Sequence, residues 1–195
     1  MQTAGGGWTL AMRTMAGGDT FNYDGPLWTN TDTLNELNFA DGGFPSVPSQ
    51  AKFPAFNVMP VSEVLIKSQL TSRFSQLGLP RVTPLLDLFK SPSSILSFIS
   101  GDARPQRLMS NGNDPICDAA WRTNSRTGSQ ARVRLGGYFF KSWNCEYGLD
   151  DQQQKTSPEM AGIGLFDNAW APFRTTVCTS PILHRFNFSD RLPFD

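Results

Sequence analysis

The segment that decides the fold lies near the start of the chain and reads Gly5-Gly6-Gly7-Trp8-Thr9-Leu10, followed by Ala11-Met12-Arg13. Three consecutive glycines allow positive φ and a close approach of neighbouring backbone. The apolar and aromatic run that follows predicts a strand over residues 8–13. A glycine hinge leading into a buried strand is typical of a domain's interior, so we expect the sequence to begin in mid-fold.

The composition is that of one globular domain with many loops. The chain has 195 residues, of which 39% are hydrophobic and 12% aromatic, and a domain of this size buries about 70% of the surface of its unfolded chain. Its 17 glycines and 14 prolines indicate many turns and few long helices. We therefore expect a single domain over residues 1–195 with a sizeable core.

The charge balance gives no reason to expect nucleic acid or an anionic membrane as a partner. The 17 basic and 17 acidic residues cancel, and the arginines are scattered along the sequence without a basic run. No segment approaches the roughly 18 consecutive apolar residues that a membrane-spanning helix requires. We therefore expect no membrane span.

Local patterns predict short elements separated by loops. Alternation predicts strands over residues 61–68, 131–135 and 162–166, with a break at Gly136-Gly137 after the second. The cap-then-proline pattern predicts two short helices, one from Thr83-Pro84 to Lys90 and one from Ser91-Pro92 to Gly101. Polar, turn-rich composition predicts loops over residues 102–129 and 144–160.

Residues 17–33 are expected to form a loop-rich segment with three aromatic anchors, Phe21, Tyr23 and Trp28. Asp24-Gly25-Pro26 within it is a turn signal. We expect Trp28, together with Trp8 of the first strand, to pack in the core.

The sequence carries no strong catalytic motif. His184 is the only histidine, and no Gly-x-Ser-x-Gly motif precedes it, so a hydrolytic triad is disfavoured. The glycine run precedes a strand rather than a helix and so lacks the context of a phosphate-binding loop. Asp150 and Glu159 could act as an acid and base, but nothing specifies a substrate for them. We therefore do not expect an enzyme.

The acidic loop after Cys145 is the strongest candidate for a metal site. Calcium binds six to eight oxygen atoms from carboxylates, carbonyls and water, and loops expose such groups. The spacing lacks the regularity of an EF-hand, so a solvated polar loop and a calcium site both stay open, and the spacing by itself favours the former. The candidate Ca²⁺ ligands are Glu146, Asp150, Asp151, Glu159 and Asp167.

The three cysteines, Cys117, Cys145 and Cys178, leave at least one without a partner in the chain. One interpretation is three buried thiols. The other is a secreted domain with one disulfide, whose third cysteine pairs outside this sequence. With one histidine and no Cys-x-x-Cys pair, a zinc site is disfavoured.

Several of these segments together resemble fibrinogen C-terminal-like domains, a family that includes the intelectins. Gly5–Leu10, with the preceding Met1-Gln2-Thr3-Ala4, resembles the family's GGGWT signature and its lead-in. Four other segments resemble the family more weakly. Residues 21–30 resemble its Phe-x-Tyr…Leu-Trp segment, and residues 131–136 resemble the strand before its calcium loop. Asn144-Cys145 resembles its Asn-Asp-Cys element, and Ser157-Pro158-Glu159…Gly162-Ile163-Gly164 resembles the end of that loop. The chain departs from the family at Asn144, where an aspartate is usual, and by the extra stretch 147–156.

The resemblance implies an α+β fold with an irregular, mostly antiparallel sheet, short helices and long loops, lacking its first strands. It also implies an extracellular or cell-surface recognition module that binds glycans or protein partners, uses at most one calcium ion, forms oligomers through regions outside this chain, and is not an enzyme. The ligand contacts would come from Trp143, Tyr147 and Trp170 near the acidic loop, since aromatic faces stack on sugars and anchor interfaces. Core packing is the alternative role for these three side chains.

The family lead-in would also supply a cysteine just upstream of Met1. Cys145–Cys178, or Cys117 with that upstream cysteine, are then the disulfide options. The alternative function is a structural or adhesion domain of a larger extracellular protein, with no small-molecule ligand and a solvated acidic loop.

Overall fold

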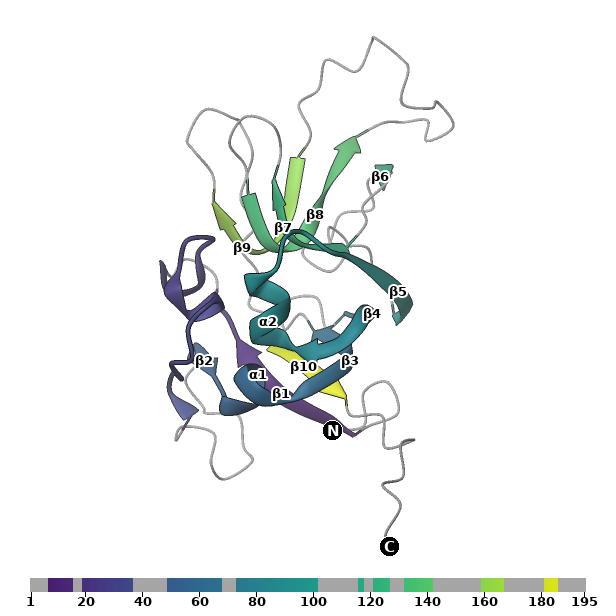
Figure 1. Ribbon diagram of the computed structural model, residues 1–195. Helices are drawn as coiled ribbons and strands as arrows, with labels where there is room; N and C mark the ends of the chain where they lie inside the picture. Colours follow the sequence, from purple (N-terminus) through teal and green to yellow (C-terminus); the bar gives the residue numbers. More distant parts are fainter. Residues whose placement is uncertain are drawn as a thin grey trace, which may run out of the picture.

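The computed structural model describes residues 7–15, 19–36, 49–67, 73–101, 116–117, 121–126, 132–141, 159–166 and 181–185. Strands dominate the described backbone, and the helices are short (Figure 1). In chain order the elements are β1 Trp8–Arg13, η2 Asp19–Phe21, η3 Pro26–Trp28, β2 Ala51–Lys52, α1 Pro54–Val58, β3 Pro60–Lys67, β4 Phe74–Pro84, α2 Leu85–Lys90, β5 Ile95–Gly101, β6 Ile116–Cys117, β7 Trp121–Arg126, β8 Arg132–Lys141, β9 Glu159–Phe166 and β10 Pro181–Arg185.

The strands join into one sheet in the order β2-β1-β10-β3-β4-β5-β7-β8-β6, and β9 pairs with β8 outside this path. Each of these pairings is antiparallel. The two α-helices have five and six residues. The expectation of a mostly antiparallel sheet with few, short helices is thereby confirmed.

Residues 8–13 of the glycine-tryptophan segment form the strand that the sequence predicts, whereas Gly5 and Gly6 lie outside the described residues. Gly7 has φ 75°, a conformation that favours glycine. Strand β1 follows directly, with β10 on one side and β2 on the other. Trp8 and Met12 are buried, as is Trp28 from the next loop. The strand is therefore an interior element of the sheet, which explains its apolar composition.

Strand β3 is buried on both faces. Val64 and Ile66 belong to the main core, whereas Leu65 packs with Trp8 in a smaller cluster on the opposite face. The strand predicted over residues 61–68 is confirmed over 61–67, with Ser68 outside the described residues, and the side that carries Leu65 is also covered. Its neighbours β10 and β4 pair with it along most of its length.

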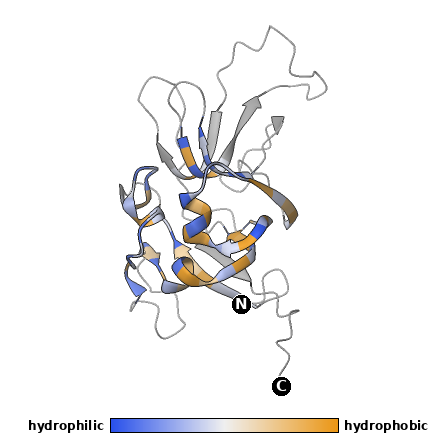
Figure 2. Ribbon diagram, viewed as in Figure 1, coloured by the Kyte–Doolittle hydropathy of each residue, from blue (hydrophilic) through white to orange (hydrophobic). Residues whose placement is uncertain are grey.

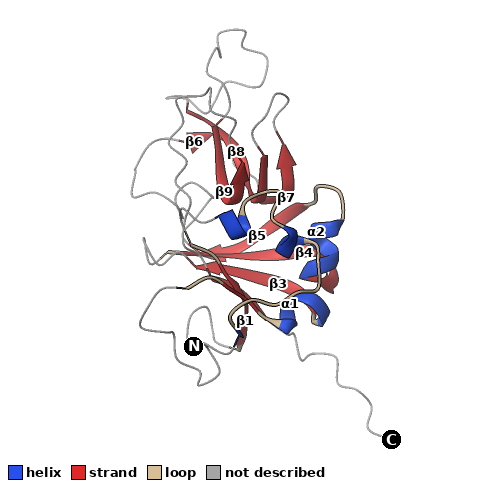
Figure 3. Ribbon diagram, turned by 90° about the vertical axis from the view of Figure 1, so that its left-hand side faces the viewer, coloured by secondary structure: helices blue, strands red, loops and turns tan. Residues whose placement is uncertain are grey.

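The main core is built around Trp28 and the two short helices. The Trp28 ring lies 5.8 Å from Phe21, edge to face, and 4.8 Å from Phe89 of α2. Phe56 of α1 stacks on Phe89 at 5.7 Å. Figure 3 shows both helices on one side of β3 and β4, and Figure 2 shows most of α2 as hydrophobic. The helices therefore cover one sheet face, and the aromatic rings fill the space between them and the η3 segment.

Only one of the two helices predicted after residue 82 is present. Helix α2 begins at Leu85; Thr83 and Pro84 still belong to β4, and no side chain caps the helix. The second prediction is wrong, because residues 95–101 form strand β5, which pairs with β4 and β7. Its apolar residues fit either a helix or a strand, and pairing on both sides selects the strand.

Strand pairing also corrects two loop predictions and one predicted break. The loop predicted over residues 144–160 is wrong at its end, because Glu159 and Met160 belong to β9. Residues 121–126, placed in a loop by their polar composition, form β7 between β5 and β8. The expected break at Gly136-Gly137 does not occur, since β8 continues to Lys141 and pairs with β9 through both glycines. Within the part of the chain that the structure describes, no helix is long and apolar enough to cross a membrane.

Candidate functional site

Two neighbouring strands present a row of arginines on one face of the sheet. Arg122 and Arg126 alternate with buried Thr123 and Ser125 along β7, and β8 continues the pattern with Arg132 and Arg134 on either side of buried Val133. Successive side chains of a strand point to opposite faces. The register sets Arg126 directly opposite Arg132. Antiparallel pairing thus gathers four guanidinium groups from two short sequence segments.

A turn from a distant part of the chain brings Tyr23 to this face. Gly25 donates its backbone N–H to the carbonyl oxygen of Asn22 at 3.1 Å, and Trp28 Nε1 donates to the same oxygen at 2.9 Å. A Cβ at Gly25 would lie 2.6 Å from the carbonyl oxygen of Thr20, so the turn requires glycine. The buried Trp28 ring therefore anchors the turn that carries Tyr23 and Asp24.

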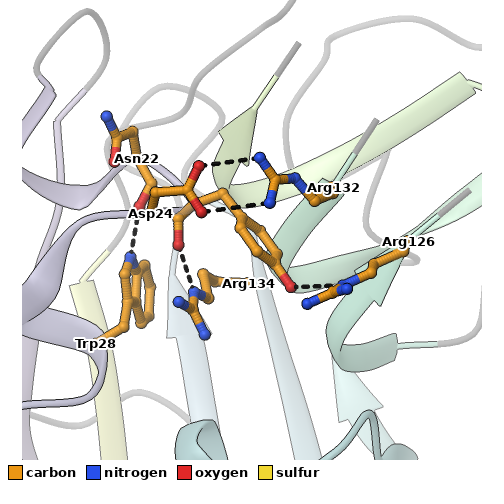
Figure 4. A network of polar contacts seen from close by, with 7 residues as sticks. Asn22, Asp24, Trp28, Arg126, Arg132 and Arg134 are labelled. Atoms are coloured by element: carbon orange, nitrogen blue, oxygen red, sulfur yellow. Dashed lines mark hydrogen bonds and ion pairs between the residues drawn. The ribbon is translucent and has the colours of Figure 1, made fainter. Parts of the chain in front are cut away.

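Three guanidinium groups lie close to the ring of Tyr23, those of Arg126, Arg132 and Arg134, which Figure 4 labels. The Cζ atoms of Arg134, Arg132 and Arg126 lie 4.5, 4.7 and 5.9 Å from the ring centroid. These distances are within the range of cation–π contacts. Arg126 Nε also donates to the Tyr23 hydroxyl at 3.3 Å, and this hydrogen bond raises the pKa of Arg126. Tyr23 is 3% exposed, so the residue is almost wholly covered.

Arg134 is the innermost of these arginines. Its Nε donates to the carbonyl oxygen of Tyr23 at 2.6 Å, and its Nη1 donates to Oδ1 of Asn124 at 2.9 Å. Burial lowers the pKa of Arg134, with Tyr23 and Asp24 opposing the shift and Arg126 and Arg132 adding to it. A guanidinium stays charged in proteins, so the shift signals a cation held in a poorly hydrated place beside two others.

Asn124 connects the arginines to the end of α2. Its Nδ2 donates to the carbonyl oxygens of Phe89 and Ser91 at 3.0 and 2.7 Å, while its Oδ1 accepts from Arg134. Asn124 has φ 48°, which asparagine tolerates better than most residues. The last carbonyls of a short helix need such partners. One amide therefore fixes the helix end and orients an arginine.

These groups line a pocket of about 720 Å³, which we call the arginine pocket. Five of its lining side chains are basic and one, Asp24, is acidic; Asp24 pairs with Arg132 at 2.9 Å. Thr29, Ser91 and Ser93 add hydroxyl-bearing side chains to the lining. The full lining comprises Tyr23, Asp24, Thr29, Phe89, Lys90, Ser91, Pro92, Ser93, Arg122, Asn124, Ser125, Arg126, Arg132 and Arg134.

The arrangement is suited to binding an anion. Guanidinium groups form paired hydrogen bonds with carboxylates, phosphates and sulfates, and hydroxyl and amide groups add further polar contacts. The charge is local, because the whole chain has a net charge of zero. The positive potential of the pocket therefore arises from how the chain folds rather than from its composition.

The site residues expected from the sequence lie almost wholly outside the described residues. This holds for the candidate calcium ligands Glu146, Asp150, Asp151 and Asp167, for the aromatic residues Trp143, Tyr147 and Trp170, and for Cys145 and Cys178. Glu159 begins β9 opposite Phe139, and Cys117 ends β6 opposite Phe140. Among the residues described, no three His, Cys, Asp or Glu side chains come together as a metal site. The calcium and disulfide expectations stay predictions.

The arginine pocket was not predicted from the sequence, because its arginines do not form a basic run. The relevant signal was the alternation in Arg122-x-Asn124-x-Arg126 and in Arg132-x-Arg134, which places polar groups on one face of each strand. Nothing in the local sequence indicates that Tyr23 and Asp24 contact these arginines, since about 100 residues separate them.

Comparison of the chain with models of known protein families, with curated proteins and with solved structures finds no match to any of the three.

Proposed function

We propose that this chain is a recognition module that binds an anionic group of its ligand in the arginine pocket. The observation that carries the proposal is the concentration of five basic side chains around one carboxylate in a pocket of about 720 Å³. Pockets for small molecules occupy about 300 to 1,000 Å³, so the space admits a sugar or a comparable group. The proposal assigns the pocket a binding role and no reaction.

An acidic glycan is the ligand class that best combines the observations. The arginines supply charged donors for a carboxylate or sulfate, and the hydroxyls of Thr29, Ser91 and Ser93 supply neutral partners for sugar hydroxyls. The resemblance to fibrinogen C-terminal-like domains supports the same assignment and an extracellular location. The recognition role is thus inferred from the resemblance to the family, whereas the negative charge of the ligand is inferred from the arginines of this chain.

A glycan array with neutral, carboxylated and sulfated members tests the proposal. We expect binding confined to the acidic glycans and weakened when salt is raised from about 0.1 to 1 M, because the Debye length falls from about 10 to 3 Å. Silence across the acidic glycans, or binding that is insensitive to salt, would contradict it. Silence would favour the alternative of a structural or adhesion domain.

Arg126 is the residue to change, because it lines the pocket, is exposed and belongs to neither core cluster. We expect Arg126→Gln to weaken binding of an acidic glycan about tenfold, the usual effect of losing a charged hydrogen bond. Arg73→Gln is the control: Arg73 immediately precedes β4 and does not line the pocket. Equal affinities of the two variants would argue against the arginine pocket as the site.

A further inference from the structure

The arginine pocket already holds one carboxylate, supplied by the chain itself. Arg132 donates from Nη1 to Oδ1 of Asp24 at 3.3 Å and from Nη2 to Oδ2 at 2.9 Å (Figure 4). This is the two-pronged geometry with which arginine binds a free carboxylate. Asp24 is the one acidic residue of the pocket lining that the structure describes. The pair therefore shows what kind of group Arg132 accepts.

The position of the pair makes it accessible to a ligand. The side chains of Arg132 and Asp24 are 29% and 55% exposed, and Asp24 lies on a turn. The Arg132 guanidinium lies over the Tyr23 ring beside those of Arg126 and Arg134. A ligand carboxylate that reaches Arg132 can therefore contact a second arginine at the same time.

We infer that Asp24 is an internal competitor that occupies the place of a ligand carboxylate on Arg132. This inference rests on the proposed function and adds two points to it: the ligand group is a carboxylate, and its affinity is set by displacement of Asp24. Exposed ion pairs are weak and shift an equilibrium by a factor of about two to five. Displacement is therefore readily reversible, and the negative charge of Asp24 lowers affinity for every anion that approaches Arg132.

The test compares Asp24→Asn with the wild-type chain, using glucuronate as the carboxylated probe and glucose as its neutral counterpart. Asparagine retains the preference for turns, so the segment keeps its conformation. We expect Asp24→Asn to bind glucuronate about two- to fivefold more tightly than the wild type, with the Nε–H resonance of Arg132 shifting in an NMR titration. Glucose should shift it in neither protein.

Asp32→Asn serves as the matched control, because it removes the same charge from an exposed aspartate that does not line the pocket. It should bind glucuronate with wild-type affinity. A second variant, Arg132→Gln, should abolish the advantage of Asp24→Asn when the two are combined, as a double-mutant cycle would show. This cycle distinguishes competition at Arg132 from a general change in charge.

The two proposals fail in different ways. If the wild type binds glucuronate and Asp24→Asn binds it no more tightly, the competitor role is overturned and the anion pocket stands. If neither protein binds glucuronate or inorganic sulfate, both the competitor role and the proposed function are overturned. Gain of affinity in Asp32→Asn equal to that in Asp24→Asn would also overturn the competitor role.

Discussion

Arg134 contacts Tyr23 from two directions: its Nε lies 2.6 Å from the Tyr23 carbonyl oxygen, and its Cζ lies 4.5 Å from the centre of the ring. The first contact fixes the backbone of the turn, and the second covers the ring. A third bond, to Asn124, carries the connection on to the end of α2. Arg134 thus joins the turn, strand β7 and helix α2, and the shape of the pocket depends on it.

We expect Arg134→Lys to lower the free energy of unfolding by about 1 to 3 kcal/mol, because a lysine ammonium cannot bond Tyr23 and Asn124 in the same planar geometry. Denaturant titration measures the change. Arg81→Lys is the control, since its guanidinium makes one long contact on the surface, and it should lie within about 0.5 kcal/mol of the wild type. Similar values for both variants would show that Arg134 has no structural role beyond that of a surface arginine.

Gly164 of β9 cannot be replaced without strain. It has φ 68°, and a Cβ there would lie 2.8 Å from Cζ2 of Trp28 and 2.9 Å from Cβ of Arg134. We expect Gly164→Ala to destabilise the protein by about 2 kcal/mol or more, since an unfavourable φ and overpacking each cost about 1 to 3 kcal/mol. Thermal unfolding, followed by the fluorescence of the tryptophans, measures it.

Gly78→Ala provides the contrast for that substitution. Its Cβ would meet Cδ1 of Ile99 at 3.3 Å, the far end of a side chain that is 47% exposed and free to move. We expect a change within about 1 kcal/mol of zero, because alanine reduces the entropy of the unfolded chain without straining this strand. Equal destabilisation by the two alanines would contradict the packing of Gly164 against Trp28.

Lys52 predicts a measurable pH dependence of stability. Its side chain is fully buried, its Nζ donates to the carbonyl oxygen of Asn30 at 2.7 Å, and the ammonium lies 4.9 Å from the Phe56 ring centroid. Burial lowers its pKa to about 8, with Lys90 adding to the shift and Asp32 opposing it. The unfolded chain, with a lysine pKa of about 10.4, therefore holds one more proton than the folded chain between pH 8 and 10.

Stability due to Lys52 should consequently rise as pH increases from about 8 to 10 and be at its lowest below pH 8, where the buried ammonium is fully charged. We expect the free energy of unfolding of the wild type, minus that of Lys52→Met, to increase over this pH range. The difference removes the contributions of other groups that titrate there. A constant difference across the range would show that the Lys52 pKa is not lowered.

Calcium binding by the acidic loop stays a prediction with a direct test. If Asp150, Asp151 and Glu159 bind Ca²⁺, millimolar calcium should raise the unfolding temperature relative to chelator, because a ligand that binds only the native state stabilises it. A calcium concentration about 100-fold above Kd adds about 2.7 kcal/mol. Magnesium at the same concentration is the control. No shift with calcium, or an equal shift with magnesium, would argue against the site.

Local patterns were sufficient for the elements whose composition matches one conformation alone. Strand β1 follows from its glycine turn and apolar run, β3 from alternation, and α2 from a leucine-rich segment after proline. They were insufficient for residues 95–101, whose Ile-Leu-Ser-Phe-Ile pattern fits a helix as well as a strand. They were also insufficient for β4, where Gly78 and two prolines interrupt the strand signal.

The arginine pocket marks the boundary between local and long-range information. Each alternating strand segment, taken by itself, specifies that Arg122, Arg126, Arg132 and Arg134 share a face with polar neighbours. Which face meets the Tyr23 turn depends on pairing of β7 with β8 and on the burial of Trp28. Alternation of side chains follows from strand geometry and can be recognised in the sequence. Bringing like charges together around one ring, by contrast, must be stabilised by the packing of residues that are distant in the sequence. Local sequence thus determined elements such as β1, β3 and α2, whereas strand pairing decided β5 and β7 and brought four scattered arginines together into one site.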